Sequence, residues 1–162
     1  ITNINNIGRY KVDVAKERAL EINRNLNIKV IKEKLNEENV IDIIKGNDYI
    51  IDACDDVKAK KLIIRNAINY KIKFISSMGT GNKFNPELLK ITDIRKTTYD
   101  KLAKKIRTWV IKEKIKGSIY VVSSTEECKK CNNVIGSTSF VPAISGMLCA
   151  SYVINDILNN IK

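Results

Sequence analysis

The clearest sign of the fold in this sequence is one stretch, Asn47-Asp48-Tyr49-Ile50-Ile51-Asp52-Ala53-Cys54-Asp55-Asp56. Its centre is a short β-branched and aromatic run between polar residues, which predicts a buried strand. Acidic side chains follow the strand, and in open α/β sheets ligands bind just beyond the carboxyl ends of strands. These acids are therefore candidates for holding a magnesium ion against a phosphate. The plainer interpretation is a solvated helix start with Asp55 or Asp56 as the N-cap.

Outward from that stretch, predicted strands and helices alternate along the chain. Apolar periodicity predicts helices over about residues 11–23, 37–45, 56–70, 102–110 and 142–161. Runs of β-branched and aromatic residues predict strands over about residues 27–32, 49–51, 73–77, 88–94 and 118–124. This alternation is typical of an α/β sheet with parallel strands at its centre, and we expect a single domain over residues 1–162.

The composition restricts the chemistry that the chain can perform. Lysine and arginine number 29 against 18 acidic residues, a net charge of +11 without any histidine. That excess favours a polyanionic partner such as nucleic acid, although a lysine-, asparagine- and isoleucine-rich composition explains it equally well. Without histidine, catalysis must rest on carboxylates, lysines, backbone amides, a metal ion or a cysteine.

Cysteine usage and hydropathy favour a reducing cytoplasm. The chain has 4 cysteines and no signal peptide, a pattern more typical of cytoplasmic proteins than of a disulfide scaffold. The run nearest to a membrane span, residues 134–158, is interrupted by polar residues, so we expect no stable membrane insertion.

Several small motifs each allow two interpretations. Cys128-Lys129-Lys130-Cys131 has the spacing of half a zinc site, or is an exposed pair of cysteines in a loop. Cys54 borders the acidic stretch, but neighbouring aspartates raise a thiol pKa, so we interpret it as a small core residue. Lys11 lies at a predicted helix start, where it completes an anion site or has no special role. The same alternatives apply to Lys58, Lys60 and Lys61.

Taken in order, several blocks resemble a known family. Thr2-Asn3-Ile4-Asn5, Ile7-Gly8-Arg9-Tyr10-Lys11 and Ile51-Asp52-Ala53-Cys54-Asp55 are similar to the ubiquitin-activating-enzyme-like adenylyltransferases, the ThiF/MoeB/HesA family. Later blocks narrow the resemblance to the tRNA threonylcarbamoyladenosine dehydratase branch, and the Thr92–Thr97 block is the most specific. These later blocks are Met78–Pro86, Thr92–Thr97, Asp100–Ala103, Lys105–Arg107, Ser123–Glu127 and Gly136–Pro142.

The resemblance implies a fold, a reaction and a set of site residues. It implies a Rossmann-like, mostly parallel sheet flanked by helices, whose first nucleotide-binding βα units would precede Ile1, so that the chain is the carboxyl-terminal two thirds of a longer protein. It implies an enzyme that uses ATP and Mg²⁺ to cyclise, with loss of water, the threonylcarbamoyl group on the tRNA adenosine next to the anticodon. Asp55 would be catalytic and hold magnesium and phosphate, Lys11 would bind the ATP phosphates, and Asn5 would lie beside the nucleotide. The implied partners are tRNA, a second copy in a homodimer, and sulfur-transfer proteins.

The departures from the family pattern keep two alternatives open. After Asn5 the family continues with a catalytic arginine and a loop, whereas Asn6 here leads directly to Ile7-Gly8. A non-catalytic binding module of the same fold is one alternative that this gap allows. The other is an adenylyltransferase that activates a ubiquitin-like sulfur-carrier protein, although such an enzyme would be expected to have a paired zinc site. The cysteine that some members carry near the last helix is replaced by Gly136-Ser137-Thr138-Ser139, which disfavours a covalent intermediate there.

Overall fold

A computed structural model describes residues 3–127 and 134–160 and contains two compact units, Ile1–Leu35 and Asn36–Lys162. The first unit contains a 3-10 turn, η1 (Ile4–Asn6), and one helix, α1 (Lys11–Ile22). The predicted strand over 27–32 is wrong, because these residues form neither helix nor strand. Alternating Ile28 and Val30 satisfy the local pattern, but a strand also needs a neighbour for its backbone hydrogen bonds. The single domain over residues 1–162 stays a prediction.

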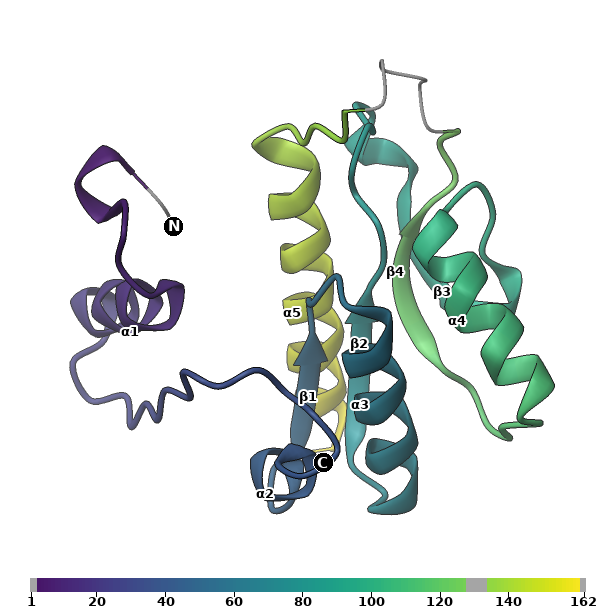
Figure 1. Ribbon diagram of the computed structural model, residues 1–162, viewed down its shortest axis with the longest axis horizontal. Coiled ribbons are helices and arrows are strands. Elements are labelled where there is room, and N and C mark those ends of the chain that lie inside the picture. The colour runs from purple at the N-terminus through teal and green to yellow at the C-terminus, as the bar shows by residue number, and fades with distance from the viewer. Residues whose placement is uncertain (1–2, 128–133, 161–162) are drawn as a thin grey trace. The chain divides into compact units, whose positions relative to one another are not determined.

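The second unit is built on a four-stranded sheet in the order β1-β2-β4-β3 (Figure 1). Strands β1 (Tyr49–Asp52), β2 (Lys73–Ser77) and β4 (Tyr120–Ser124) are parallel, and β3 (Leu89–Asp93) pairs antiparallel with β4. The expected mostly parallel α/β sheet is therefore confirmed. The remaining elements are α2 (Val40–Ile44), α3 (Val57–Asn69), η2 (Pro86–Leu88), η3 (Ile94–Lys96), α4 (Lys101–Lys112) and α5 (Phe140–Asn160).

Helices cover both faces of the sheet. Helices α3 and α4 cover one face, where Ile64, Ile106 and Val121 belong to one apolar cluster. Helix α5 covers the other, where Val122 and Cys149 belong to a second cluster. Successive strand residues point to opposite faces, so Val121 and Val122 serve the two cores in turn. Because β1, β2 and β4 are parallel, their carboxyl ends lie at the same end of the sheet.

Two predicted helices differ in length from those observed. Only Val40–Ile44 is helical in the predicted 37–45 segment, because the Asn36 side chain accepts hydrogen bonds from the backbone N–H of Glu38 and Asn39 and forms a turn there. Gly46 follows with a φ of +85°, the left-handed conformation typical of the residue after a helix. The last helix begins at Phe140, slightly before the predicted Pro142.

Helix α5 is the one described helix that is long and apolar enough to cross a membrane by length and composition. In the structure its buried side, Val141, Ser145 and Cys149, packs on the sheet. Its outer side exposes Met147, Ile154 and Leu158. Packing on the sheet therefore explains the apolar residues on one side of α5 but not those on its exposed side.

Candidate functional site

The acidic stretch forms the end of β1 and the start of α3, as the sequence predicted. Asp52 closes the strand and is 2% exposed. Asp56 is the N-cap of α3, since its Oδ1 accepts hydrogen bonds from the backbone N–H of Lys58 at 2.7 Å and Ala59 at 3.2 Å. Asp55 lies between them and is exposed. The three carboxylates thus occupy three different environments.

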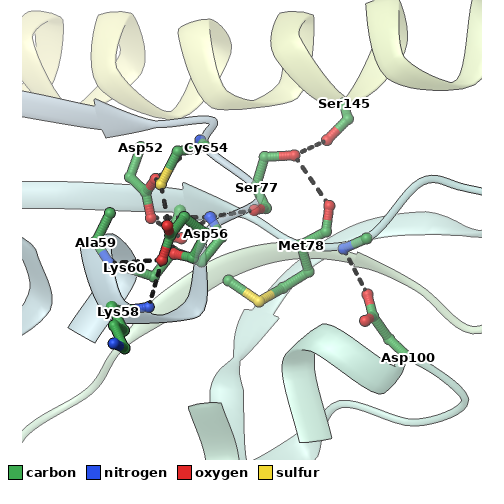
Figure 2. A network of polar contacts seen from close by, with 12 residues as sticks. Asp52, Cys54, Asp56, Lys58, Ala59, Lys60, Ser77, Met78, Asp100 and Ser145 are labelled. Atoms are coloured by element: carbon green, nitrogen blue, oxygen red, sulfur yellow. Dashed lines mark hydrogen bonds and ion pairs between the residues drawn. The ribbon is translucent and has the colours of Figure 1, made fainter. Parts of the chain in front are cut away.

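Asp52 is held in a buried polar network (Figure 2). The Lys60 ammonium donates to Asp52 Oδ2 at 2.9 Å, to Ser76 Oγ at 3.0 Å and to the Ser77 carbonyl at 2.7 Å. Ser76 Oγ also donates to Asp52 Oδ2 at 2.6 Å. A lysine has three N–H donors, so the ammonium of Lys60 is fully hydrogen-bonded. The network ties α3 to the ends of β1 and β2, and thereby positions the loop that carries Asp55. It also excludes the phosphate-binding interpretation of Lys60.

Cys54 is half-buried and its thiol donates to Asp52 Oδ1 at 2.9 Å. Burial and the hydrogen bond to Asp52 raise the pKa of the Cys54 thiol to about 12. A thiol with this pKa has almost no thiolate near neutral pH, and the thiolate is the nucleophilic form. The expectation that the neighbouring acid raises this pKa is confirmed, and Cys54 is not an activated nucleophile.

A cavity of about 690 Å³ opens beside these strand ends. Asp55 lines it from the β1–α3 loop, and residues 78–83 line it from the loop after β2. The start of α4 contributes Asp100, Lys101 and Lys105, and Pro142 and Gly146 contribute from α5. Five of the blocks that carry the family resemblance therefore meet at one cavity, although they are distant in the sequence.

Besides Lys60, a second lysine is buried, and this one, Lys83, lines the cavity. Lys83 is 1% exposed, and its Nζ donates to the Ser124 carbonyl at 3.4 Å and lies 4.0 Å from Asp100 Oδ2. Asp100 is the N-cap of α4 through Ala103 N–H, and it also accepts from Gly79 N–H at 2.8 Å (Figure 2). A Cβ on Gly79 would lie 3.1 Å from Asp100 Oδ1, so glycine allows this close approach.

Sequence reasoning missed Lys83 and Asp100 as parts of the site. Asp100 carried a usable signal, because aspartate just before an amphipathic helix is a typical N-cap. Lys83 follows the glycine-containing turn after a strand, which is a weaker signal. The sequence around Lys83 and Asp100 does not predict that their side chains are buried, since burial depends on residues elsewhere in the chain.

The other predicted site residues belong to the first unit. Lys11 is the first residue of α1 and is exposed. Tyr10 gives this helix no side-chain cap, and the Asp13 N–H donates to the Tyr10 carbonyl, so the backbone N–H groups of Lys11 and Val12 remain available to an anion. Asn5 lies in η1, exposed, with its backbone N–H bonded to Asn3 Oδ1 at 3.0 Å. The roles of Asn5, Lys11 and Asp55 stay predictions.

The metal predictions have separate outcomes. Cys128 and Cys131 lie outside the described residues. Among residues 3–127 and 134–160, no three His, Cys, Asp or Glu side chains gather in a group that could hold a metal ion. Mg²⁺ commonly takes only one or two carboxylates and completes its shell with phosphates and water. An exposed carboxylate on a cavity wall, such as Asp55, suits that kind of site.

Comparisons with known proteins agree with the fold and the motifs. The ThiF family model matches residues 1–161. The tRNA threonylcarbamoyladenosine dehydratase of Bacillus subtilis is 31% identical, over 100% of this chain and 74% of its own length.

Two solved structures of the Escherichia coli tRNA N6-threonylcarbamoyladenosine dehydratase are also similar. The complex with AMP has a TM-score of 0.91 at 27% identity and covers 98% of this chain and 68% of the other. The complex with ATP has a TM-score of 0.88 at 28% identity, with 97% and 67% covered. The chain therefore belongs to the ThiF family, in the tRNA threonylcarbamoyladenosine dehydratase branch that its motifs predicted.

Proposed function

We propose that this protein is an ATP-dependent enzyme that dehydrates and cyclises the threonylcarbamoyl group on the tRNA adenosine next to the anticodon. The observation that carries this proposal is the meeting of five family blocks around the cavity at the strand ends. The relative in Bacillus subtilis is named tRNA threonylcarbamoyladenosine dehydratase, and the similar Escherichia coli structures are complexes with AMP and with ATP. Ligands in open α/β sheets bind at this edge of the sheet.

The reaction needs an activated carboxylate. A carboxylate oxygen of the threonylcarbamoyl group forms a bond to a phosphorus atom of ATP, and ADP or pyrophosphate leaves. A nitrogen of the same side chain then attacks the acyl carbon, and the bond from that carbon to the phosphorylated oxygen breaks. The nitrogen's proton passes to solvent, and the oxygen departs with phosphate or AMP, so the tRNA loses the elements of water. Such chemistry depends mainly on positioning and charge stabilisation and needs no histidine.

Asp55 and Lys11 are the proposed ligands of the nucleotide. Asp55 would hold Mg²⁺, and its exposed carboxylate makes no hydrogen bond or ion pair within the described residues. When bound, the ion would neutralise charge on the phosphates. Lys11 and the uncapped start of α1 would bind phosphate, and Asn5 would lie beside the nucleotide.

The charge of the protein supports tRNA as the substrate. The net charge is +11, α4 exposes Lys101, Lys104 and Lys105, and Lys101 and Lys105 line the cavity. Contacts to phosphates dominate nucleic-acid affinity and weaken as salt rises. Affinity for tRNA should therefore fall steeply between low and physiological salt.

A homodimer is the proposed assembly. The exposed apolar side of α5, with Met147, Ile154 and Leu158, suits burial against a second copy better than contact with water. Sedimentation of wild type and of an Ile154→Asp, Leu158→Asp variant tests this, and a monomeric wild type would contradict it. Cytoplasmic location, expected from the cysteine usage, and sulfur-transfer partners, implied by the family resemblance, stay predictions.

One experiment separates the proposed function from its alternatives. The protein is incubated with ATP, Mg²⁺ and tRNA that carries threonylcarbamoyladenosine, and the nucleosides are analysed by mass spectrometry, with ATP omitted as the control. We expect ATP-dependent loss of water from the modified adenosine. Unchanged nucleosides would overturn the proposal. Pyrophosphate exchange stimulated by a small carrier protein would then indicate the adenylyltransferase, and tRNA binding without turnover the non-catalytic module.

A further inference from the structure

The ammonium of Lys83 is buried but only partly hydrogen-bonded. Of its three N–H donors, one makes a long hydrogen bond to the Ser124 carbonyl at 3.4 Å. Asp100 Oδ2, at 4.0 Å, is beyond hydrogen-bond distance. Among the described residues Lys83 has no further polar partner. A charge that is 1% exposed is costly to bury unless its donors are used, so a further acceptor is expected.

Asp100 is already committed to other donors. Its Oδ1 accepts from Ala103 N–H at 2.9 Å, and its Oδ2 accepts from Gly79 N–H at 2.8 Å. These bonds cap α4 and hold the loop after β2, so the carboxylate stays in place whatever Lys83 does. The Asp100 carboxylate is a counter-ion of Lys83 at 4.0 Å but accepts no hydrogen bond from the Lys83 ammonium.

Lys83, whose ammonium has N–H donors without an acceptor, lines the cavity. Asp55 lines the same cavity from the β1–α3 loop, and Lys101 and Lys105 line it from α4. The side formed by the β2 loop and α4 therefore has a net positive charge, with Lys83, Lys101 and Lys105 against Asp100, whereas the β1 end contributes the Asp55 carboxylate. An anionic group bound on the positive side would lie in the same cavity as the proposed metal ligand Asp55.

We propose that Lys83 binds the carboxylate of the substrate's threonylcarbamoyl group and orients it for activation. This inference rests on the proposed function. One carboxylate oxygen accepts a charge-assisted hydrogen bond from Lys83, which leaves the other oxygen to react with ATP. A carboxylate fits better than an ATP phosphate, because Asp55, the proposed magnesium ligand for the phosphates, lines the cavity from the β1 end and not from the side of Lys83. Lys83 thereby makes the site selective for tRNA that carries the carboxylate.

The test compares two tRNAs that differ only in the threonylcarbamoyl group. Affinity for each is measured with Mg²⁺ and a non-hydrolysable ATP analogue, in wild type, in Lys83→Met and in Lys116→Gln. Lys116 is exposed in the turn before β4 and is a matched control for the loss of one charge. We expect wild type and Lys116→Gln to prefer the modified tRNA. Lys83→Met should lose that preference by about 10- to 100-fold, the usual effect of one hydrogen bond to a charged group.

Each outcome of this comparison has one meaning. Affinities of Lys83→Met for unmodified tRNA and for the ATP analogue should remain those of wild type. A folded Lys83→Met variant with an unchanged preference overturns the inference, as does a variant that loses only affinity for the ATP analogue. If Lys83→Met does not fold, Lys83→Gln is compared instead, with near-UV circular dichroism as the check. Wild type that removes water from tRNA without any preference also overturns the inference, whereas wild type that removes no water overturns the proposed function itself.

Discussion

Two lysine–aspartate pairs lie at the carboxyl edge of the sheet, and they differ in how completely they are bonded. Lys60 is 0% exposed, and its ammonium has three partners, with Asp52 at 2.9 Å. Lys83 is 1% exposed, and its ammonium has one long hydrogen bond, with Asp100 at 4.0 Å. Burial is the same, so burial alone does not reveal what a charged residue does. The number of filled hydrogen bonds separates a structural lysine from one that has room for a ligand.

The largest effect is expected from Lys60→Met. The change leaves the Asp52 carboxylate buried without its counter-ion and should lower the free energy of unfolding by about 3–5 kcal/mol. Urea denaturation measures this, with Lys58→Met, an exposed neighbour on α3, as the control. The Lys58→Met variant should stay within about 0.5 kcal/mol of wild type. Equal losses in the two variants would show that the network stabilises nothing.

The next largest effect is the loss of ATP turnover expected from Asp55→Asn. Asp55 makes no hydrogen bond or ion pair within the described residues, in contrast to buried Asp52. Asp55→Asn should lower ATP turnover by about 10²- to 10³-fold, the usual loss for one group that stabilises charge in the transition state. Its unfolding curve should match that of wild type. Wild-type turnover in this variant would remove Asp55 from the proposed metal site.

A smaller change in stability is expected from Lys83→Met, and it completes the comparison with Lys60. Only one long hydrogen bond is lost, and Asp100 keeps its two backbone donors. The free energy of unfolding should therefore fall by no more than about 1 kcal/mol. Urea denaturation beside Lys60→Met tests the contrast directly. A loss as large as that of Lys60→Met would make Lys83 a structural residue as well.

Asp93 provides a bonded carboxylate away from the cavity. Partial burial alone would raise its pKa, but backbone N–H groups of Arg95 and Ile119 and the Arg95 guanidinium hold the pKa of Asp93 below its usual value. Because the folded pKa is the lower one, this stabilisation is complete above the unfolded pKa of about 3.9 and is lost as pH falls through the folded pKa. Asp93→Asn should therefore be less stable than wild type at neutral pH, and the gap should close in strong acid. A gap that is independent of pH in urea titrations would contradict this assignment.

The smallest effect is expected at Cys54, which contacts the bonded pair. With the pKa of its thiol raised to about 12, Cys54 should resist alkylation near pH 7, since the reactive thiolate forms only in strong base. Iodoacetamide labelling, followed by mass spectrometry of the peptide, measures this on the folded protein. Urea-unfolded protein is the control and should be labelled readily. Equal labelling in the two states would show that Asp52 and burial do not protect the thiol.

Local patterns were sufficient to predict most helices, strands and caps. The run Tyr49-Ile50-Ile51 became β1, and Asp56 became the N-cap of α3, because strand formation and helix capping depend mainly on nearby residues. The predicted burial of this strand is wrong, because β1 lies at the edge of the sheet and Ile51 is 48% exposed. The same local pattern failed over residues 27–32. No neighbour for a strand is encoded in that segment itself, so alternation alone could not predict the outcome.

The candidate site divides in the same way. The sequence alone was enough to identify the family, the position of Asp55 beyond a strand and the chemistry that a chain without histidine allows, since each depends on residue type and spacing. Only the tertiary structure could distinguish Lys60 from Lys83. Their partners, Asp52 and Ser76 for one and Asp100 and Ser124 for the other, come from separate segments. Burial and hydrogen-bond saturation are properties of the assembled sheet edge, and they decide which charge stabilises the fold and which one is left for a ligand.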